Sequence, residues 1–385
     1  MSPRWSLVCS ACDREETPPA RLATLCATCG APWLVHLAEL PEPTVKRALE
    51  ARSWSLWRYR EWLPIAGSED PVSLGEGGTP LLPASRLGRE FGLQHLLIKD
   101  ESQNPTGSFK ARGMAAAVTR ARYDGATALT TPTAGNAGVA LSAYGRRAGI
   151  PVTVFAPRGT PPRILEQIRT FGADLEEVEG HIGDCGVRAR HHAAERGAFD
   201  VSTLREPYRI EGKKTMGLEI AEQLGWRFPD VVVYPAGGGT GLIGMWLAFR
   251  DLLRAGWVQG TPPRLYVVQS RGCAPVVRAF HSGSDHTDPW PDPDTAAVGL
   301  RVPSPLGGKL MLQALRDTGG GAVAVPEPDI AWGMERMTSA EAVDAGPEGG
   351  ATVAALKELV HAGRVEPGHT VVLFNTGAGW LYRVP

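Results

Sequence analysis

Six short runs of β-branched and apolar residues recur between residues 96 and 375, and helix-like stretches separate most of them. The runs read LLIK, ALTTP, VTVFAP, VVVYPAG, LYVVQS and TVVLFN. Such runs predict strands that are buried on both faces, and their alternation with helices predicts an α/β fold with mostly parallel sheets. Binding sites in such sheets collect at the carboxyl ends of the strands. We therefore expect functional residues in the loops that follow these runs.

The segment NPTGSFKARG, residues 104–113, places a lysine at the start of a predicted helix. Residues 114–118 favour a helix, and Gly107 and Ser108 suit the preceding turn and N-cap. The positive end of the helix dipole disfavours a cation in the first turn by up to about 1 kcal/mol. This position suits a lysine that must be neutral to attack a carbonyl carbon, so Lys110 is a candidate nucleophile. The alternative is a lysine that extends its charge into water.

A glycine-rich loop, PAGGGTG at residues 235–241, follows the run VVVY and precedes an apolar segment that is predicted to be helical. Successive glycines let backbone N–H groups converge on an anion at a helix N-terminus, so the loop predicts a phosphate site. The spacing Gly239-x-Gly241-x-x-Gly244 also matches the dinucleotide fingerprint. That fingerprint requires an acidic residue near the end of the next strand, where this chain has QS at residues 269–270. A dinucleotide site and a plain tight turn are the alternatives.

Two other strand-end loops carry polar groups. TPTAGNAG offers the Thr133 hydroxyl, backbone N–H groups around Gly135 and the Asn136 amide, which suit a carboxylate or a ring hydroxyl. FNTGAG contains Thr376, whose hydroxyl can face a heteroaromatic nitrogen. Each loop alone is a weak signal. Together with Lys110 and the glycine-rich loop, they describe a site for pyridoxal 5'-phosphate (PLP), in which the lysine binds the aldehyde, the glycines bind the phosphate and two polar side chains contact the ring.

The N-terminal segment contains four of the six cysteines, as two CxxC pairs separated by thirteen residues. Two such pairs predict a zinc ribbon, and disulfides are the alternative. Residues 1–40 carry three arginines against four acidic residues, so the module lacks the basic excess that nucleic-acid binding requires. We predict a structural zinc held by Cys9, Cys12, Cys26 and Cys29, whereas Cys185 and Cys273 are predicted to be buried.

Composition restricts the partners and the location of the protein. Its 40 Lys and Arg residues against 41 Asp and Glu residues give a formal net charge of -1, so no global field attracts nucleic acid or an anionic membrane. No stretch approaches the roughly 18 apolar residues of a membrane span, and no long apolar segment precedes the first cysteines. We predict a cytoplasmic protein without nucleic-acid or membrane partners. Residues 44–62 are predicted to form one helix that ties the cysteine module to the body.

The sequences of these motifs and their order along the chain resemble those of the fold-type II PLP enzymes and, more narrowly, those of the threonine synthase family. NPTGSFKARG resembles that family's NPTGSFKDRG, TAGNAG its serine/threonine-Gly-Asn loop, and YRIEGKKT at residues 208–215 a motif that contains RIEGQKT. PAGGGTG and NTGAG follow in the expected order, and the resemblance extends from about Leu74 to the C-terminus. It implies two doubly wound α/β domains with PLP between them, plus the zinc-ribbon-like module at residues 1–40. The larger domain would comprise residues 41–104 and 205–385, and the smaller one residues 105–204.

The resemblance also implies roles for individual residues and a homodimeric assembly. Lys110 would bind PLP covalently and transfer protons, Asn136 would hydrogen-bond the ring hydroxyl, and Thr376 would face the ring nitrogen. Arg209 would bind a substrate phosphate, and a surface ion pair with Glu206 or Glu211 is the alternative. Lys213 and Lys214 would add positive field or remain solvated. The cofactor phosphate would lie against Gly237, Gly238, Gly239, Thr240 and Gly241, and the substrate carboxylate against Thr133, Ala134, Gly135, Asn136 and Ala137.

Several positions depart from the family pattern and concern the substrate. Ala111 stands where Asp is common, Ala137 where a hydroxyl is common, Gly238 where Asn is common, and Leu381 where Lys is frequent. The leading hypothesis is a threonine synthase-like lyase that converts O-phosphohomoserine and water into threonine and phosphate. The alternative enzyme is a serine/threonine dehydratase or β-replacement enzyme that acts on a related amino acid in a specialised pathway. The alternative outside catalysis is an interaction module, either with the fold of PLP enzymes or built on the zinc ribbon.

Overall fold

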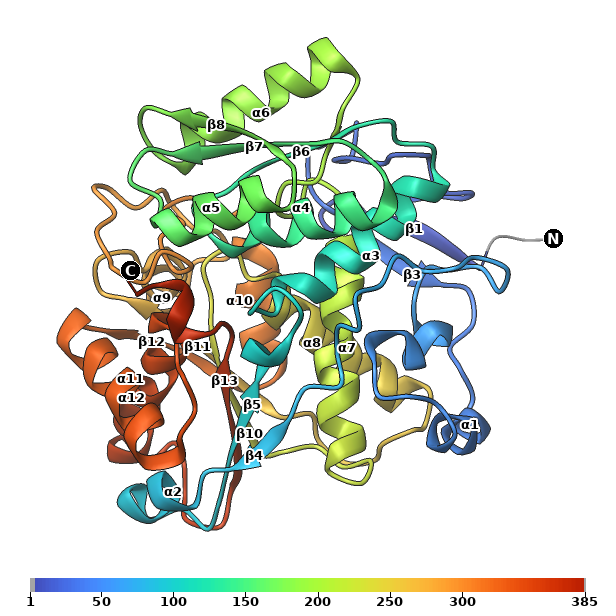
Figure 1. The fold of residues 1–385 in the computed structure, drawn as a ribbon. Helices are drawn as coiled ribbons and strands as arrows, with labels where there is room; N and C mark the ends of the chain where they lie inside the picture. The colour runs from blue at the N-terminus through green and yellow to red at the C-terminus, as the bar shows by residue number, and fades with distance from the viewer. Residues whose placement is uncertain (1–3, 384–385) are drawn as a thin grey trace.

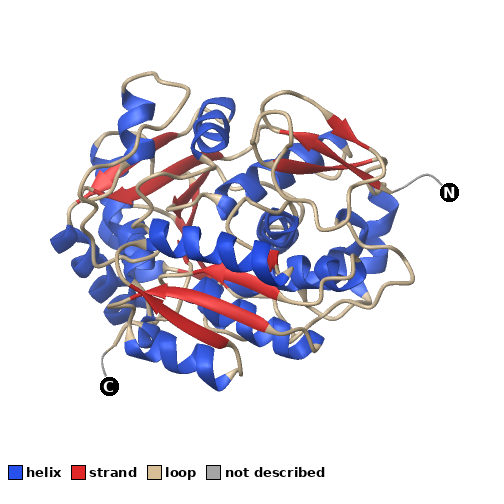
Figure 2. Cartoon of the chain, turned by 90° about the horizontal axis from the view of Figure 1, so that it is seen from above, coloured by secondary structure: helices blue, strands red, loops and turns tan. Residues whose placement is uncertain are grey.

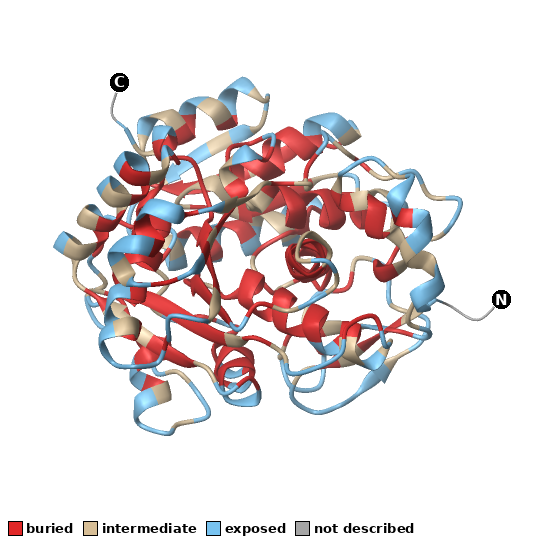
Figure 3. Cartoon of the chain, turned by 90° about the horizontal axis from the view of Figure 1, so that it is seen from below, coloured by how far each residue is buried: buried red, intermediate tan, exposed pale blue. Residues whose placement is uncertain are grey.

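The computed structural model describes residues 4–383 and contains two α/β units and a small N-terminal module (Figure 1). The unit with the smaller sheet lies above the larger one in Figure 1, and helix α7 (Tyr208–Gln223) runs beside both. Figure 2 shows helices on both sides of the strands. In Figure 3 the buried residues gather in the interior, and the exposed ones lie on the outer helices and loops. None of the described helices has both the length and the apolar composition needed to cross a membrane.

The larger sheet is parallel except for one edge strand, and within the described residues its order is β12-β11-β10-β13-β5-β4. Alternate residues of β10 face opposite sides, so that Val231 and Val233 join one hydrophobic core and Val232 and Tyr234 join another. A strand covered on both faces is apolar throughout, which explains the run VVVY. The strands are β4 (Leu81–Pro83), β5 (His95–Asp100), β10 (Val231–Pro235), β11 (Arg264–Ser270), β12 (Gly321–Val325) and β13 (Thr370–Asn375).

Helices cover both faces of this sheet, which confirms the doubly wound α/β prediction for the larger unit. One core contains residues of α2 (Ser85–Phe91), α11 (Glu327–Glu341) and α12 (Pro347–His361). The core on the opposite face contains residues of α7, α8 (Thr240–Arg254), α9 (Pro275–His281) and α10 (Gly308–Asp317).

The smaller sheet is wholly parallel, with the order β8-β7-β6-β9. Its main core includes residues of α3 (Lys110–Tyr123), α4 (Asn136–Ala148) and α5 (Pro162–Thr170), whereas α6 (Ile182–Arg196) packs against Phe155 in a separate cluster. All its strands lie between residues 105 and 204, the range predicted for the smaller domain, and the domain boundaries stay a prediction. The strands are β6 (Leu129–Pro132), β7 (Val152–Pro157), β8 (Asp174–Val178) and β9 (Phe199–Asp200).

The N-terminal module is an antiparallel sheet of β1 (Trp5–Cys9), β2 (Glu15–Glu16) and β3 (Trp33–Leu37). It contacts the end of α3 that lies farthest from Lys110, where the Leu22 N–H donates to Asp124 and the Arg120 guanidinium lies 4.9 Å from the Trp5 ring centroid.

The single helix predicted for residues 44–62 is wrong. The segment forms a 3₁₀ turn η1 (Pro43–Val45), the short helix α1 (Lys46–Glu50) and the 3₁₀ segment η2 (Leu56–Trp62). The buried Arg58 guanidinium donates to the carbonyls of Leu49 (2.8 Å) and Arg52 (3.0 Å), which folds the two halves together. Carbonyls at a helix end need such a partner, so these bonds within the segment outweigh its local preference for one continuous helix.

A buried ion network joins the helix that begins at Lys110 to its neighbours. Arg112 on α3 lies 2.6 Å from Glu101 in η3 (Glu101–Gln103) and 2.6 Å from Glu219 on α7. Lys99 on β5 lies 2.8 Å from the second oxygen of Glu219, and the four side chains are fully buried. The network fixes the start of α3 relative to β5 and α7, and it therefore positions Lys110.

Candidate active site

A cavity of about 330 Å³ contains nearly all the residues that the sequence predicts for a PLP site. Lys110 lies in its wall, together with residues 133–137 after β6, residues 237–241 after β10 and Thr376 after β13. The four predicted loops therefore meet at the carboxyl ends of their strands, as expected for parallel sheets. Arg209 is the exception, because it is not among the described residues that line the cavity.

Lys110 is the first residue of α3, as predicted, and the N-cap is Phe109 rather than Ser108. The preceding turn is fixed by pairing with the loop after β13. The Phe109 N–H donates to the Thr376 carbonyl (3.0 Å), and the Ala378 N–H donates to the Gly107 carbonyl (2.9 Å). These two bonds hold Lys110 and Thr376 on one framework.

The environment of Lys110 favours its neutral form. Burial and the nearby positive charge of Arg209 lower the pKa of Lys110 to about 7, and the negative charge of Glu348 acts in the opposite direction. Its Nζ lies 3.9 Å from the centroid of the Phe109 ring, and no described carboxylate lies within ion-pair distance of it. A lysine with this pKa can attack an aldehyde and exchange protons near neutral pH.

Arg209 is buried and does not form the surface ion pair that was its alternative. Its Nη1 donates to the Val201 carbonyl (2.7 Å), and its buried Nε has no hydrogen-bond partner among residues 4–383. The Glu206 carboxylate instead accepts the N–H groups of Tyr208 (2.8 Å) and Arg209 (3.1 Å). Burial raises the pKa of Glu206 to about 7, although the charge of Arg209 opposes this shift. The Nε of Arg209 is therefore a buried donor that no described group accepts.

Lys213 is a site residue whose place the sequence did not reveal. Its Nζ donates to Oγ1 of Thr240 (2.9 Å), the first residue of α8. The side chain is fully buried, and burial together with the charges of Arg209 and Lys110 lowers its pKa well below the usual value. A buried lysine beside a helix N-terminus is unfavourable unless an anion occupies the same place. Exposure to solvent was one of the two predictions for Lys213 and Lys214, and it is wrong because both side chains are buried.

The glycine-rich loop has little space for side chains. Gly239, the N-cap of α8, has a φ of 79°, a conformation that favours glycine. A Cβ added at Gly237, Gly239 or Gly241 would collide with the Gly299 carbonyl, the Met311 side chain or the Tyr234 hydroxyl, respectively. The loop, the α8 N-terminus and Lys213 together suit a phosphate dianion.

The loop after β6 presents Asn136 at the start of α4. The Asn136 amide donates to the Tyr382 hydroxyl (3.2 Å), and its buried Oδ1 has no partner among the described residues. Oγ1 of Thr133 accepts the N–H groups of Gly135 (3.0 Å) and Gly138 (3.0 Å), so in this structure it shapes the loop. An unpaired amide oxygen beside Lys110 indicates that a ligand completes the site.

Glu348 and Tyr382 also line the cavity, and the sequence analysis missed both. Glu348 is 5% exposed; its Oε1 accepts the Gly299 N–H (2.7 Å), and its Oε2 has no partner among residues 4–383. Burial and the Glu348 carboxylate raise the pKa of Tyr382 well above its usual value. No local motif marks either residue. Glu348 lies in the first turn of α12, whose sequence resembles that of an ordinary core helix.

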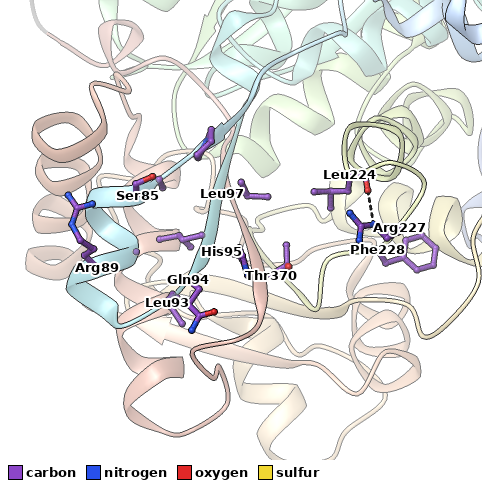
Figure 4. Close-up of a pocket in the computed structure, with 14 residues that line it drawn as sticks. Ser85, Arg89, Leu93, Gln94, His95, Leu97, Leu224, Arg227, Phe228 and Thr370 are labelled. Atoms are coloured by element: carbon purple, nitrogen blue, oxygen red, sulfur yellow. Dashed lines mark hydrogen bonds between the residues drawn. The ribbon is translucent and has the colours of Figure 1, made fainter.

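These groups fit PLP, with Lys110 as an amine of lowered pKa, a phosphate-sized anion site beside Lys213, and the unpaired polar atoms of Asn136 and Glu348. A second pocket of about 890 Å³ contains none of the predicted site residues. It lies at the amino ends of β5 and β13, where Figure 4 shows His95 and Thr370 between Arg89 and Arg227. The predicted chemistry is therefore confined to the carboxyl ends of the strands.

The four N-terminal cysteines form a compact cluster. The Sγ–Sγ distances are 3.3 Å for Cys9 and Cys29, 3.8 Å for Cys12 and Cys26, and 3.6 Å for Cys12 and Cys29. All four sulfur atoms lie within 4.8 Å of one another and form no disulfides. Four thiolates at this spacing can hold one tetrahedral metal ion. Cys185 and Cys273 are buried, as predicted.

The family of pyridoxal-phosphate dependent enzymes matches residues 72–377. This chain belongs to that family. It is 34% identical over 324 residues to a threonine synthase from Methanosarcina acetivorans, in a match that covers 84% of this chain and 79% of the relative. It is 32% identical over 342 residues to a threonine synthase from Methanocaldococcus jannaschii, with 89% and 84% covered. The fold also matches maize serine racemase with a TM-score of 0.68, at 22% identity and with 78% of this chain and 88% of that chain covered.

Proposed function

We propose that this protein is a PLP-dependent lyase that converts O-phosphohomoserine and water into threonine and inorganic phosphate. The observation that carries the proposal is the placement of Lys110, with its pKa lowered to about 7, in one cavity with the phosphate loop, Asn136 and Thr376. The similarity to threonine synthases over most of the chain supports this choice of reaction.

Different residues of the chain have different roles in this reaction. When bound, PLP supplies an electron sink for negative charge at the substrate α-carbon. The neutral Nζ of Lys110 removes the α-proton and moves protons at the neighbouring carbons. Lys213 and the 237–241 loop would hold the cofactor phosphate, and Asn136 would hold the ring hydroxyl. Thr376 would offer the ring nitrogen a neutral hydroxyl, which suits elimination and replacement chemistry.

We propose Arg209 as a residue that recognises the substrate phosphate, and Thr133, Ala134, Gly135 and Ala137 as the surroundings of the substrate carboxylate. The buried, unused Nε of Arg209 supports its role, because a buried guanidinium donor without a partner gains most from a ligand oxygen. Arg209 also carries one of the two charges that most affect Lys110. A phosphate beside Arg209 would reduce that effect and leave Lys110 a stronger base.

The N-terminal cluster is proposed to hold one structural zinc ion through Cys9, Cys12, Cys26 and Cys29. The distances between the thiols support a single tetrahedral ion, and the attachment of the module to α3 supports a structural role. A homodimer in the cytoplasm remains our prediction for the assembly and its location.

A serine/threonine dehydratase or β-replacement enzyme is the second candidate. The observation that favours it lies in the cavity wall, where Ala137 and Gly238 offer no side-chain hydrogen bonds to a phosphate. Both reactions use Lys110 and the same ring contacts, so the substrate side chain decides between them.

The deciding experiment compares two products with one preparation of the PLP-loaded protein. Inorganic phosphate is measured with O-phosphohomoserine as substrate, and keto acid is measured with threonine and with serine. We expect phosphate release with threonine as co-product and little keto acid. Rapid keto-acid formation without phosphate release would replace our proposal by the dehydratase.

A further inference from the structure

Glu348 is the only carboxylate among the described residues that line the cavity with Lys110. It lies in the first turn of α12, and its side chain is buried. None of the ion pairs within residues 4–383 includes it, so no described cation lies within 4.0 Å of its charge. A buried carboxylate without a cation is costly, because it has lost its hydration. The roles given above to Lys110, Asn136 and Thr376 do not account for this cost.

The two oxygens of Glu348 differ in their contacts. Oε1 accepts the Gly299 N–H (2.7 Å), which belongs to the loop between α9 and α10. Gly299 has no room for a side chain, because a Cβ there would lie 2.5 Å from Oε1. Oε2 is buried and has no hydrogen-bond partner among the described residues. The carboxylate is thus held in place through one oxygen, and the other is left for a ligand.

Tyr382, which follows η4 (Gly379–Leu381), borders the same space as this unpaired oxygen. A Cβ placed on Gly346 would lie 3.0 Å from Cε2 of Tyr382 and 3.4 Å from Oε2 of Glu348. The Tyr382 hydroxyl accepts a hydrogen bond from Asn136 (3.2 Å), and its raised pKa keeps it neutral. Because a neutral phenol is a very weak base, Glu348 is the proton acceptor of this wall.

The other titratable groups around the cavity cannot take a proton from an arriving substrate. Arginine guanidiniums stay protonated, and Lys110 would already hold the cofactor. The negative charge of Glu348 raises the pKa of Lys110, so the carboxylate acts electrostatically on the place where a substrate amine must react. These other groups are Lys110 on α3, Arg190 on α6, Arg205 after β9, Tyr234 on β10, Arg301 between α9 and α10, and Tyr382, with Arg209 and Lys213 on α7 buried nearby.

An amino acid carries a protonated amino group near neutral pH, and this group cannot bond to carbon until it loses a proton. We propose that Oε2 of Glu348 binds the α-ammonium group of the amino-acid substrate and takes one proton from it. The N–H bond breaks, its electron pair stays on nitrogen, and an O–H bond forms on Glu348. The carboxyl group later gives the proton to water. The role rests on the proposed function in that an amino acid reacts at Lys110, and it applies to both candidate reactions.

The test measures how fast the visible absorbance of the PLP-loaded protein changes on mixing with O-phosphohomoserine, L-threonine or L-alanine. Alanine has no leaving group, so its signal reports binding without turnover. Stopped-flow measurements compare the wild type with Glu348→Gln from about pH 6 to about pH 8, where the amino group of the substrate is mostly protonated. Glutamine can still accept the Gly299 N–H but cannot take a proton, so the variant should react only with the free amine.

The expected result is a loss of rate that depends on pH. At pH 7 the second-order rate of Glu348→Gln should be about a hundredfold or more below that of the wild type, the range that a positioned general base contributes. The ratio of the variant rate to the wild-type rate should rise about tenfold per pH unit, as the fraction of free amine does. A purely structural role of Glu348 would lower the rate equally at every pH.

Two further variants separate proton transfer from other effects. Glu348→Asp keeps a carboxylate and should restore the wild-type pH profile at a lower rate. Glu358→Gln is the matched control and should leave rate and profile unchanged, because Glu358 also lies on α12 but is exposed and outside the cavity.

The outcomes distinguish this role from the proposed function. Parallel pH profiles of the wild type and Glu348→Gln, with rapid absorbance changes in both, would overturn the role of Glu348 and leave the proposed function standing. A ratio that rises with pH for threonine and alanine supports the role even if the wild type releases no phosphate from O-phosphohomoserine. A wild-type absorbance that none of the three amino acids changes would overturn both.

Discussion

Lys213 donates a 2.9 Å hydrogen bond from its Nζ to Oγ1 of Thr240, the first residue of helix α8. The contact brings a fully buried lysine to the positive end of a helix dipole, near two further basic side chains, Lys110 and Arg209. Such an arrangement destabilises the protein unless a phosphate binds there. It therefore predicts opposite effects of Lys213 on stability and on cofactor affinity.

Lys213→Met should weaken PLP binding about tenfold or more, because a charge-assisted hydrogen bond to phosphate is lost. The same substitution should raise the melting temperature of the PLP-free protein. Burial lowers the pKa of Lys213 well below its usual value, and a lysine that is harder to protonate in the folded than in the unfolded state costs stability at neutral pH. Fluorescence titration with PLP and calorimetry of the PLP-free form measure the two effects. Tighter or unchanged PLP binding would contradict the role of Lys213.

Lys214→Met is the control for this prediction. Lys214 is the next residue on α7 and is also buried, but it lies 2.6 Å from Asp251 and 3.6 Å from Glu211. Its removal leaves the buried Glu211 without a cation within 4.0 Å and leaves Asp251 only the longer contacts to Arg250 (3.9 Å) and Arg254 (3.8 Å). The protein should therefore become less stable, while the affinity for PLP stays close to that of the wild type.

Lys110 is predicted to carry the cofactor. Borohydride reduction of the PLP-loaded protein should fix PLP to the peptide that contains Lys110, and attachment at Lys99, Lys213 or Lys214 would contradict the assignment. The rate of PLP attachment should rise with pH and level off above about 7, because the pKa of Lys110 is lowered to about 7 and only the neutral amine attacks. Stopped-flow absorbance at several pH values gives this profile.

Arg209 should affect both the pKa of Lys110 and the binding of the substrate phosphate, and two substitutions separate these effects. Arg209→Gln should raise the pKa of Lys110, because the positive charge of Arg209 helps to lower it. Arg209→Lys keeps a charge and should leave the pKa nearly unchanged. It should still reduce turnover of O-phosphohomoserine about tenfold or more, because lysine cannot donate two parallel bonds to one phosphate.

The comparison substrate and a second variant complete this prediction. Arg209→Lys should change any activity on serine or threonine little, since those substrates carry no phosphate. Glu348→Gln should lower the pKa of Lys110, because the Glu348 charge raises it. Normal turnover of O-phosphohomoserine by Arg209→Lys would remove Arg209 from the substrate site, and equal shifts by Arg209→Gln and Glu348→Gln would contradict the electrostatic explanation.

The four N-terminal cysteines are predicted to bind about one zinc ion per chain, as a closed tetrahedral thiolate site does. Cys12→Ala should release the metal and lower the melting temperature, whereas the visible spectrum of PLP-loaded protein should change little. Elemental analysis and thermal unfolding test this, with Cys273→Ala as the control, because Cys273 is buried outside the cluster. A metal-free wild type of normal stability would rule the zinc site out.

The sequence predicts the parts of the site that lie in continuous loops, and it fails for contacts between distant segments. Thr376 directly follows an apolar run, and Lys110 and Asn136 begin the helices that come after the next loops, so the positions of the strands locate all three. Lys213 and Glu348 lie on helices and reach the cavity through packing that no local pattern records. The helix expected at residues 44–62 fails in the same way, because Arg58 folds back onto the carbonyls of Leu49 and Arg52 and pairs with Glu222 on α7.

The same dependence on distant contacts determines which strands can be predicted. The apolar runs predict the central strands well, because these are buried on both faces. The edge strand β8 reads DLEEV and is largely exposed, and β9 has two residues, so neither gives an apolar run. Their pairing with β7 and β6 depends on neighbours that the sequence does not place.

Glu219 provides the last prediction, since it accepts ion pairs from both Arg112 (2.6 Å) and Lys99 (2.8 Å) without contact with water. Glu219→Gln should lower the free energy of unfolding by about 3–5 kcal/mol, because it leaves two buried cations with too little negative charge. Urea unfolding at pH 7 measures this loss, and Glu166→Gln, at an exposed position on α5, should have almost no effect.

The pH dependence of this loss identifies its cause. Burial alone would raise the pKa of Glu219, but the charges of Arg112 and Lys99 outweigh it and lower the pKa. The folded protein thus binds fewer protons here than the unfolded chain, whose glutamates titrate near about pH 4.3. The stabilisation from Glu219 is complete above that pH and is lost as the pH falls through the lowered value. Wild-type stability should therefore decline more steeply below about pH 4 than that of Glu219→Gln, and parallel declines would show that Glu219 is not the group responsible.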